Sequence, residues 1–152
     1  MDSCVFCEIV NGSSPANIVW EDTNHMAFLS IFPNTDGFTV VITKKHYSSY
    51  YFDHPDKILN GLILASKKVA GKIDKAFDGV GRTGLILEGF GVDHLHAKLF
   101  PMHGTKGSWQ KKSSNINKFF QKYEGYISSH DYKRENEKKL AVIASKIRKT
   151  KA

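Results

Sequence analysis

The segment Gly84–Gly104, GLILEGFGVDHLHAKLFPMHG, carries the pattern on which the fold prediction depends. From residue 93 to residue 100, hydrophobic side chains alternate with His94, His96 and Lys98. Side chains of a β-strand point to opposite faces in turn, so the pattern predicts a strand with these three residues in one row. Two imidazoles and an ammonium beside a glycine-rich approach suit chemistry on a phosphate. The alternative is an edge strand with a solvated basic face, and HxHxK alone does not decide between the two.

Length and composition predict one soluble globular domain, with 152 residues of which 41% are hydrophobic and 24% charged. No hydrophobic run approaches the roughly 20 residues of a membrane span, and the N-terminus MDSCVFCEIV lacks the pattern of a signal peptide. We therefore expect a cytoplasmic protein without a membrane partner. The formal charge of +7 favours anionic partners such as nucleotides or nucleic acid, but much of the excess lies in the C-terminal tail.

The two cysteines stand near the N-terminus as Cys4-x-x-Cys7. In a reducing compartment such a pair indicates half of a zinc site or a redox pair. A redox pair is expected beside a thioredoxin-like βαβ unit, and no such pattern follows. A tetrahedral zinc site needs two more ligands, which are usually histidines. Two buried cysteines without a metal are the third interpretation, and the spacing leaves it open.

The rest of the chain predicts antiparallel strands and one long helix. Strands are expected over residues 17–22, 25–32, 38–43 and 85–88, and GRTG at 81–84 is expected to be a turn. The helix begins near Pro55 and ends before Asp78-Gly79, with a hydrophobic stripe of Ile58, Leu62, Ala65, Val69, Ile73 and Phe77. After a polar loop, helices are expected over 115–127 and 131–149.

Taken in order, CxxC, an ED-containing hairpin, VVITKKH, the long helix and HLHAKLFP resemble the histidine-triad (HIT) family of nucleotide hydrolases and transferases. The resemblance covers roughly Cys4–His103, and several ordered segments make it more specific than HxHxK alone. It implies an α+β fold with an antiparallel sheet of about five strands, one long helix and usually a homodimer. We therefore expect a HIT-like domain over residues 1–104 and a helical C-terminal extension over 105–152, packed on the same domain.

The resemblance also implies a reaction and a set of site residues. His96 matches the histidine that attacks the α-phosphate of a nucleotide, such as a nucleoside phosphoramidate or a dinucleoside polyphosphate. A histidine–nucleotide intermediate forms, and water or another acceptor resolves it. In family members that contain this CxxC, two histidines complete a structural zinc site, and these histidines match His46 and His94. The expected zinc ligands are therefore Cys4, Cys7, His46 and His94. The expected substrate contacts are Ser30, Ile31, Glu88 and Gly89.

Several residues depart from the family pattern. Lys98 replaces the third histidine, Phe38 replaces a histidine before the VVIT strand, Ser30 matches the ribose-binding acid, and Leu87 matches an asparagine that helps to hold the phosphate. An ammonium is a fixed positive charge but a poorer proton donor than an imidazolium, so we predict that Lys98 holds a phosphate oxygen.

Three alternatives follow from these departures. One is a nucleotide-binding protein with weakened catalysis, and another is a structural zinc protein without His96 chemistry. The third is a nucleic-acid-binding protein that uses the basic tail, with stacking groups at Tyr123, Tyr126 and Tyr132.

Overall fold

Five antiparallel strands form one sheet in the computed structural model, which describes residues 4–112, 121–123 and 133–150. The strands lie in the order β1-β2-β3-β5-β4. Their bounds are β1 Ile18–Glu21, β2 His25–Leu29, β3 Thr39–Thr43, β4 Val80–Ile86 and β5 His96–His103. The predicted α+β fold with five antiparallel strands is therefore confirmed. The interpretation of the histidine strand as an edge strand is wrong, because β5 pairs with β3 on one side and β4 on the other.

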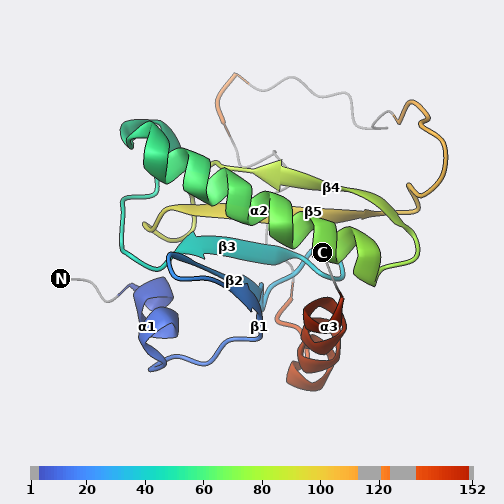
Figure 1. The fold of residues 1–152 in the computed structure, drawn as a ribbon, viewed down its shortest axis with the longest axis horizontal. Helices are drawn as coiled ribbons and strands as arrows, with labels where there is room; N and C mark the ends of the chain where they lie inside the picture. Colours follow the sequence, from blue (N-terminus) through green and yellow to red (C-terminus); the bar gives the residue numbers. More distant parts are fainter. Residues whose placement is uncertain (1–3, 113–120, 124–132, 151–152) are drawn as a thin grey trace.

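Two helices cover one face of the sheet. The long helix α2, Asp56–Ala76, runs across the strands, and α3, Glu137–Lys149, lies at the β1 side of the sheet (Figure 1). The helix α3 begins six residues later than the expected start at residue 131, because the side chain of Asn136 accepts a hydrogen bond from the backbone N–H of Lys138 and caps the helix there. Of the helix expected over 115–127, residues 121–123 are not helical and the rest lies outside the described residues. None of the described helices has the length and hydrophobicity to span a membrane.

The two faces of the sheet bury two separate hydrophobic clusters. Alternate residues of β2 and β3 divide between them, so that Ala27 and Val41 pack with α2 and α3 while Phe28 and Val40 pack toward the N-terminal helix α1, Val5–Asn11. On β5, Ala97 belongs to the α2 cluster. By the same alternation, His96 and Lys98 point to the α1 face. Helix α3 adds four residues to the α2 cluster, which are Leu140, Ile143, Ala144 and Ile147. The domain boundary expected at residue 104 stays a prediction.

The stretch expected to be a turn at 81–84 is part of β4. A Cβ atom on Gly81 would lie 2.3 Å from the carbonyl oxygen of Thr105. The glycine thus allows the chain after β5 to pack directly on β4, where the Gly81 N–H donates to the Thr105 hydroxyl over 3.1 Å. A glycine inside a strand that admits a close neighbour gives the same sequence signal as a turn, which explains the incorrect expectation.

Candidate functional site

His96 is held in a defined orientation at the start of β5. Its ring is 3% exposed, and its Nδ1 lies 2.5 Å from the backbone oxygen of His94. A carbonyl oxygen only accepts, so Nδ1 carries the proton, and the lone pair of the neutral ring lies on Nε2. Burial lowers the pKa of His96 below its ordinary value of 6.5, and the positive charge of Lys98 acts in the same direction. The lowered pKa favours the neutral ring at pH 7, which is the form in which an imidazole can act as a nucleophile.

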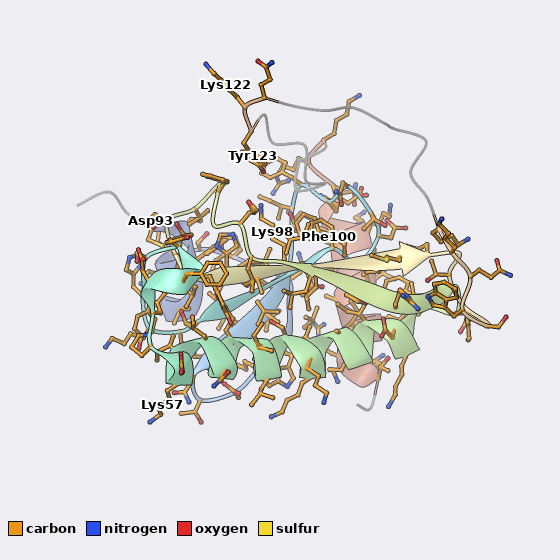
Figure 2. All side chains as sticks on the ribbon, turned by 90° about the horizontal axis from the view of Figure 1, so that it is seen from above. Lys57, Asp93, Lys98, Phe100, Lys122 and Tyr123 are labelled. Atoms are coloured by element: carbon orange, nitrogen blue, oxygen red, sulfur yellow. The ribbon has the colours of Figure 1, made fainter. Side chains whose placement is uncertain are left out.

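A cavity of about 370 Å³ opens beside His96 on the α1 face of the sheet. Lys98 also lines it, and Figure 2 places Lys98 and Phe100 on the side of the sheet away from α2. Apart from His96, Lys98 and two serines, its lining is made of glycine, proline and hydrophobic side chains, among them Val5, Phe6, Ile9, Phe28, Leu29, Phe32, Phe38, Val40, Phe90 and Val92. A mostly hydrophobic cavity with a few polar groups in its lining is typical of a small-molecule site.

Lys98 forms an ion pair with Glu88. The Nζ atom lies 2.5 Å from Oε1, and the two side chains are only 12% and 8% exposed. The contact depends on the register of β4 and β5, in which Ile86 lies opposite Lys98 and Glu88 follows two residues later. Both residues were predicted site residues, but the sequence gives no sign that they pair. Glu88 contacts the lysine from outside the set of residues that line the cavity.

The other predicted substrate contacts divide between the cavity and its surroundings. Ser30 and Ile31 line the cavity, and the Ser30 hydroxyl accepts the backbone N–H of Phe32 over 3.2 Å. Gly89 has φ of 76°, and a Cβ atom there would lie 2.8 Å from the carbonyl oxygen of Ser49. The backbone conformation and this close contact therefore explain the glycine at position 89 without any contact to a substrate. The substrate contacts of Ser30, Ile31 and Gly89 stay predictions.

The four predicted metal ligands converge on one point. One donor atom from each of Cys4, Cys7, His46 and His94 lies within 4.8 Å of the other three. The Nδ1 atom of His94 is 3.4 Å from the sulfur of Cys4 and 3.6 Å from that of Cys7. His94 donates from Nε2 to the backbone oxygen of Thr43 over 2.7 Å, so the lone pair on Nδ1 points toward the cysteines. Two thiols and two imidazoles form the donor set of a closed, structural zinc site.

The surroundings of Cys7 affect the ionisation of its thiol. Burial, followed by the hydrogen bond and charge of Cys4, raises the pKa of Cys7. The thiol therefore keeps its proton unless a nearby positive charge stabilises the thiolate, which zinc does when bound. The donor set of two cysteines and two histidines fits a structural zinc ion.

Phe6, between the two cysteines, connects this cluster to His96. Its ring meets the rings of His94 and His96 edge-on, with centroids 5.7 and 5.4 Å apart. Phe6 is not among the residues predicted for the site, although a large hydrophobic residue between the two cysteines of CVFC is consistent with its burial in α1. One side chain of α1 thus contacts both His94, a candidate metal ligand, and His96.

A second aromatic contact brings the C-terminal part of the chain to the site. Tyr123 stacks on Phe90 with ring centroids 5.6 Å apart, and Phe90 lines the cavity. Figure 2 shows Tyr123 on the same side of the sheet as Lys98. The other two tyrosines proposed to stack on nucleic acid, Tyr126 and Tyr132, lie outside the described residues.

Comparisons with known proteins agree with this geometry. The family model for the HIT domain matches residues 11–105. An uncharacterized HIT-like protein of Methanocaldococcus jannaschii is 38% identical over 108 residues, which are 68% of this chain and 82% of that protein. The crystal structure of a hypothetical histidine triad nucleotide-binding protein from Sulfolobus tokodaii has a TM-score of 0.72 and 25% identity, and the match covers 97% of this chain and 91% of that one.

A Zn-bound histidine triad family protein from Mycobacterium smegmatis shares the fold, with a TM-score of 0.67, 23% identity and coverage of 95% of this chain and 93% of its own. The family model nevertheless carries the assignment, because it spans more than half of the sequence. On that evidence, the chain belongs to the HIT domain family.

Proposed function

We propose that this protein is a nucleotide hydrolase or nucleotidyl transferase that acts on the α-phosphate of a nucleotide through His96. The observation that carries the proposal is the buried, neutral His96, whose Nδ1–H is fixed on the His94 carbonyl while Nε2 is free to act as a nucleophile. Nε2 attacks phosphorus, and the bond to the leaving group breaks with its electron pair on the leaving group. Water or another acceptor then cleaves the phosphorus–nitrogen bond and restores His96.

The cavity supports a nucleoside phosphoramidate or a dinucleoside polyphosphate as substrate. Its hydrophobic lining suits a base and ribose, and Lys98 beside His96 supplies a positive charge for a phosphate oxygen. Ser30 and Ile31 lie where they can contact the nucleoside. We further propose that the protein acts in the cytoplasm as a homodimer.

The proposed zinc ion would be held by Cys4, Cys7, His46 and His94, and its contribution would be structural. It would tie α1 to the segment that enters β5. The His94 ring would then be fixed from both sides, by the metal on Nδ1 and by Thr43 on Nε2. This arrangement supports the position of the carbonyl oxygen that orients His96.

The decisive experiment traps the intermediate. The wild-type protein, incubated with a nucleotide labelled at the α-phosphate and quenched in base, should carry label on His96, as shown by peptide mapping. His96→Asn should carry none and should lose turnover without losing the fold. The matched control is His103→Asn, because His103 lies on the same strand but outside the cavity lining. Equal turnover of wild type and His96→Asn would refute the proposal.

The burial of Lys98 against Glu88 favours a second candidate, a nucleotide-binding protein with weakened catalysis. An ammonium already paired with a carboxylate offers less net positive charge to a transferring phosphoryl group. This candidate predicts binding of AMP to the cavity without label on His96.

A further inference from the structure

The ion pair between Lys98 and Glu88 differs from the other ion pairs of the described residues. It is the one in which neither side chain is more than 12% exposed, whereas Lys44 and Glu21, for example, are 27% and 53% exposed. Lys98 lines the cavity beside His96. Glu88, which is not part of the cavity lining, forms an ion pair with the Lys98 ammonium. The positive charge that the cavity offers to a phosphate is therefore already opposed by a carboxylate.

A carboxylate oxygen on an ammonium makes the same kind of charged contact that a phosphate oxygen makes there. Away from bulk water, such charged contacts are screened little. The free energy of phosphate binding to Lys98 therefore depends strongly on the charge of Glu88. An incoming phosphate must either replace the carboxylate or share the ammonium with it. In both cases the negative charge of Glu88 weakens phosphate binding.

We propose that Glu88 is a specificity-determining residue that acts through Lys98 and keeps the affinity of the site for phosphate groups low. The proposal rests on the proposed function and deepens it, because it concerns how that site treats its product. A nucleoside monophosphate carries more charge than the esterified phosphate from which it is released. Without Glu88, the unopposed lysine would therefore hold the product most tightly, and the carboxylate promotes its release.

Binding of AMP and of inorganic phosphate to the full-length, zinc-loaded protein tests the proposal by titration calorimetry. Glu88→Gln keeps the shape of the side chain and removes its charge, and it should bind AMP about tenfold more tightly than wild type. In the background of Lys98→Met, the same Glu88→Gln change should alter AMP affinity by less than about twofold, because the lysine through which it acts is gone. The matched control is Glu21→Gln, which removes the carboxylate of an exposed ion pair and should leave AMP affinity unchanged.

Glu88→Asp provides a test that does not depend on the folding of Glu88→Gln. It retracts the charge from the ammonium and should tighten AMP binding by about threefold. Unchanged or weaker binding of both probes by Glu88→Gln, or by Glu88→Asp if the first variant does not fold, overturns the proposal. An equal effect of Glu88→Gln with and without Lys98 also overturns it, because Glu88 would then act on the phosphate directly.

These measurements need no turnover, so they separate the two proposals. Tighter AMP binding by Glu88→Gln in a protein that leaves no label on His96 would refute the proposed function alone. His96-dependent turnover together with an unchanged AMP affinity of Glu88→Gln would refute the role of Glu88 alone.

Discussion

Phe6→Leu should lower both the stability of the protein and the activity of His96. The Phe6 ring is 9% exposed and makes three edge-on ring contacts, with Phe28, His94 and His96, at centroid distances of 5.4, 5.7 and 5.4 Å. Leucine preserves a hydrophobic side chain but has no ring edge. At about 0.5–1.5 kcal/mol for each aromatic contact, the expected loss for three contacts is roughly 1.5–4.5 kcal/mol in the free energy of unfolding.

The assay for Phe6→Leu is denaturant unfolding of zinc-loaded protein, with turnover of a nucleoside phosphoramidate measured under native conditions. Phe52→Leu is the matched control, because Phe52 also contacts two aromatic rings but is 75% exposed, and it should change stability by less than about 0.5 kcal/mol. A fall in kcat of the folded Phe6→Leu variant, with zinc still bound, would show that the ring positions His96. The reasoning is refuted if Phe6→Leu is as stable as Phe52→Leu, or if its kcat equals that of wild type.

Three further predictions concern the metal, the pH dependence and the cation. Cys4→Ser should lose the bound zinc and melt at least about 5 °C below wild type, measured by elemental analysis and thermal unfolding; full zinc content in the variant would contradict the assigned ligands. Because the pKa of His96 is lowered, kcat/KM should stay level from pH 7.5 to 6.5 and fall only below that, where a proton occupies Nε2. A decline centred above pH 6.5 would be inconsistent with this. Lys98→Met should reduce kcat by a factor on the order of 10²–10³. If the variant instead has the kcat of wild type on every nucleotide that His96 cleaves, Lys98 has no role in the reaction.

Local periodicity was sufficient for the strand that carries His96 and Lys98 and for the long helix, whereas the five-stranded sheet and the role proposed for His96 came from the family resemblance. The alternation in residues 93–100 assigned His96 and Lys98 to one face, and the hydrophobic stripe from Leu62 to Ile73 predicted the helix that covers the other face. The ligands Cys4 and Cys7 came from their spacing, whereas His46 and His94 came from the family resemblance. The structure brings all four together.

What the sequence could not supply depends on contacts between distant segments. The pairing of Lys98 with Glu88 follows from the register of two strands, which no local pattern encodes. The turn expected at residues 81–84 was wrong for the same reason, because the close packing of Gly81 on Thr105 joins two segments that are distant in the sequence. The helical pattern over 131–149 did not show where α3 begins, because its start depends on the cap that Asn136 forms.

The candidate metal ligands and His96 are connected through His94. The His94 ring donates a hydrogen bond to the backbone oxygen of Thr43 from Nε2, and its Nδ1 faces the cysteines. The backbone oxygen of His94 accepts the Nδ1–H of His96. Only Leu95 separates the two histidines, so a displacement of the His94 ring shifts the carbonyl that selects the tautomer of His96. A zinc ion that takes no part in the reaction would still help to hold the His94 backbone, whose oxygen accepts the Nδ1–H of His96. Removal of the metal should therefore impair catalysis at temperatures where the sheet remains folded, and a chelated protein with native circular dichroism and unchanged kcat would disprove this coupling.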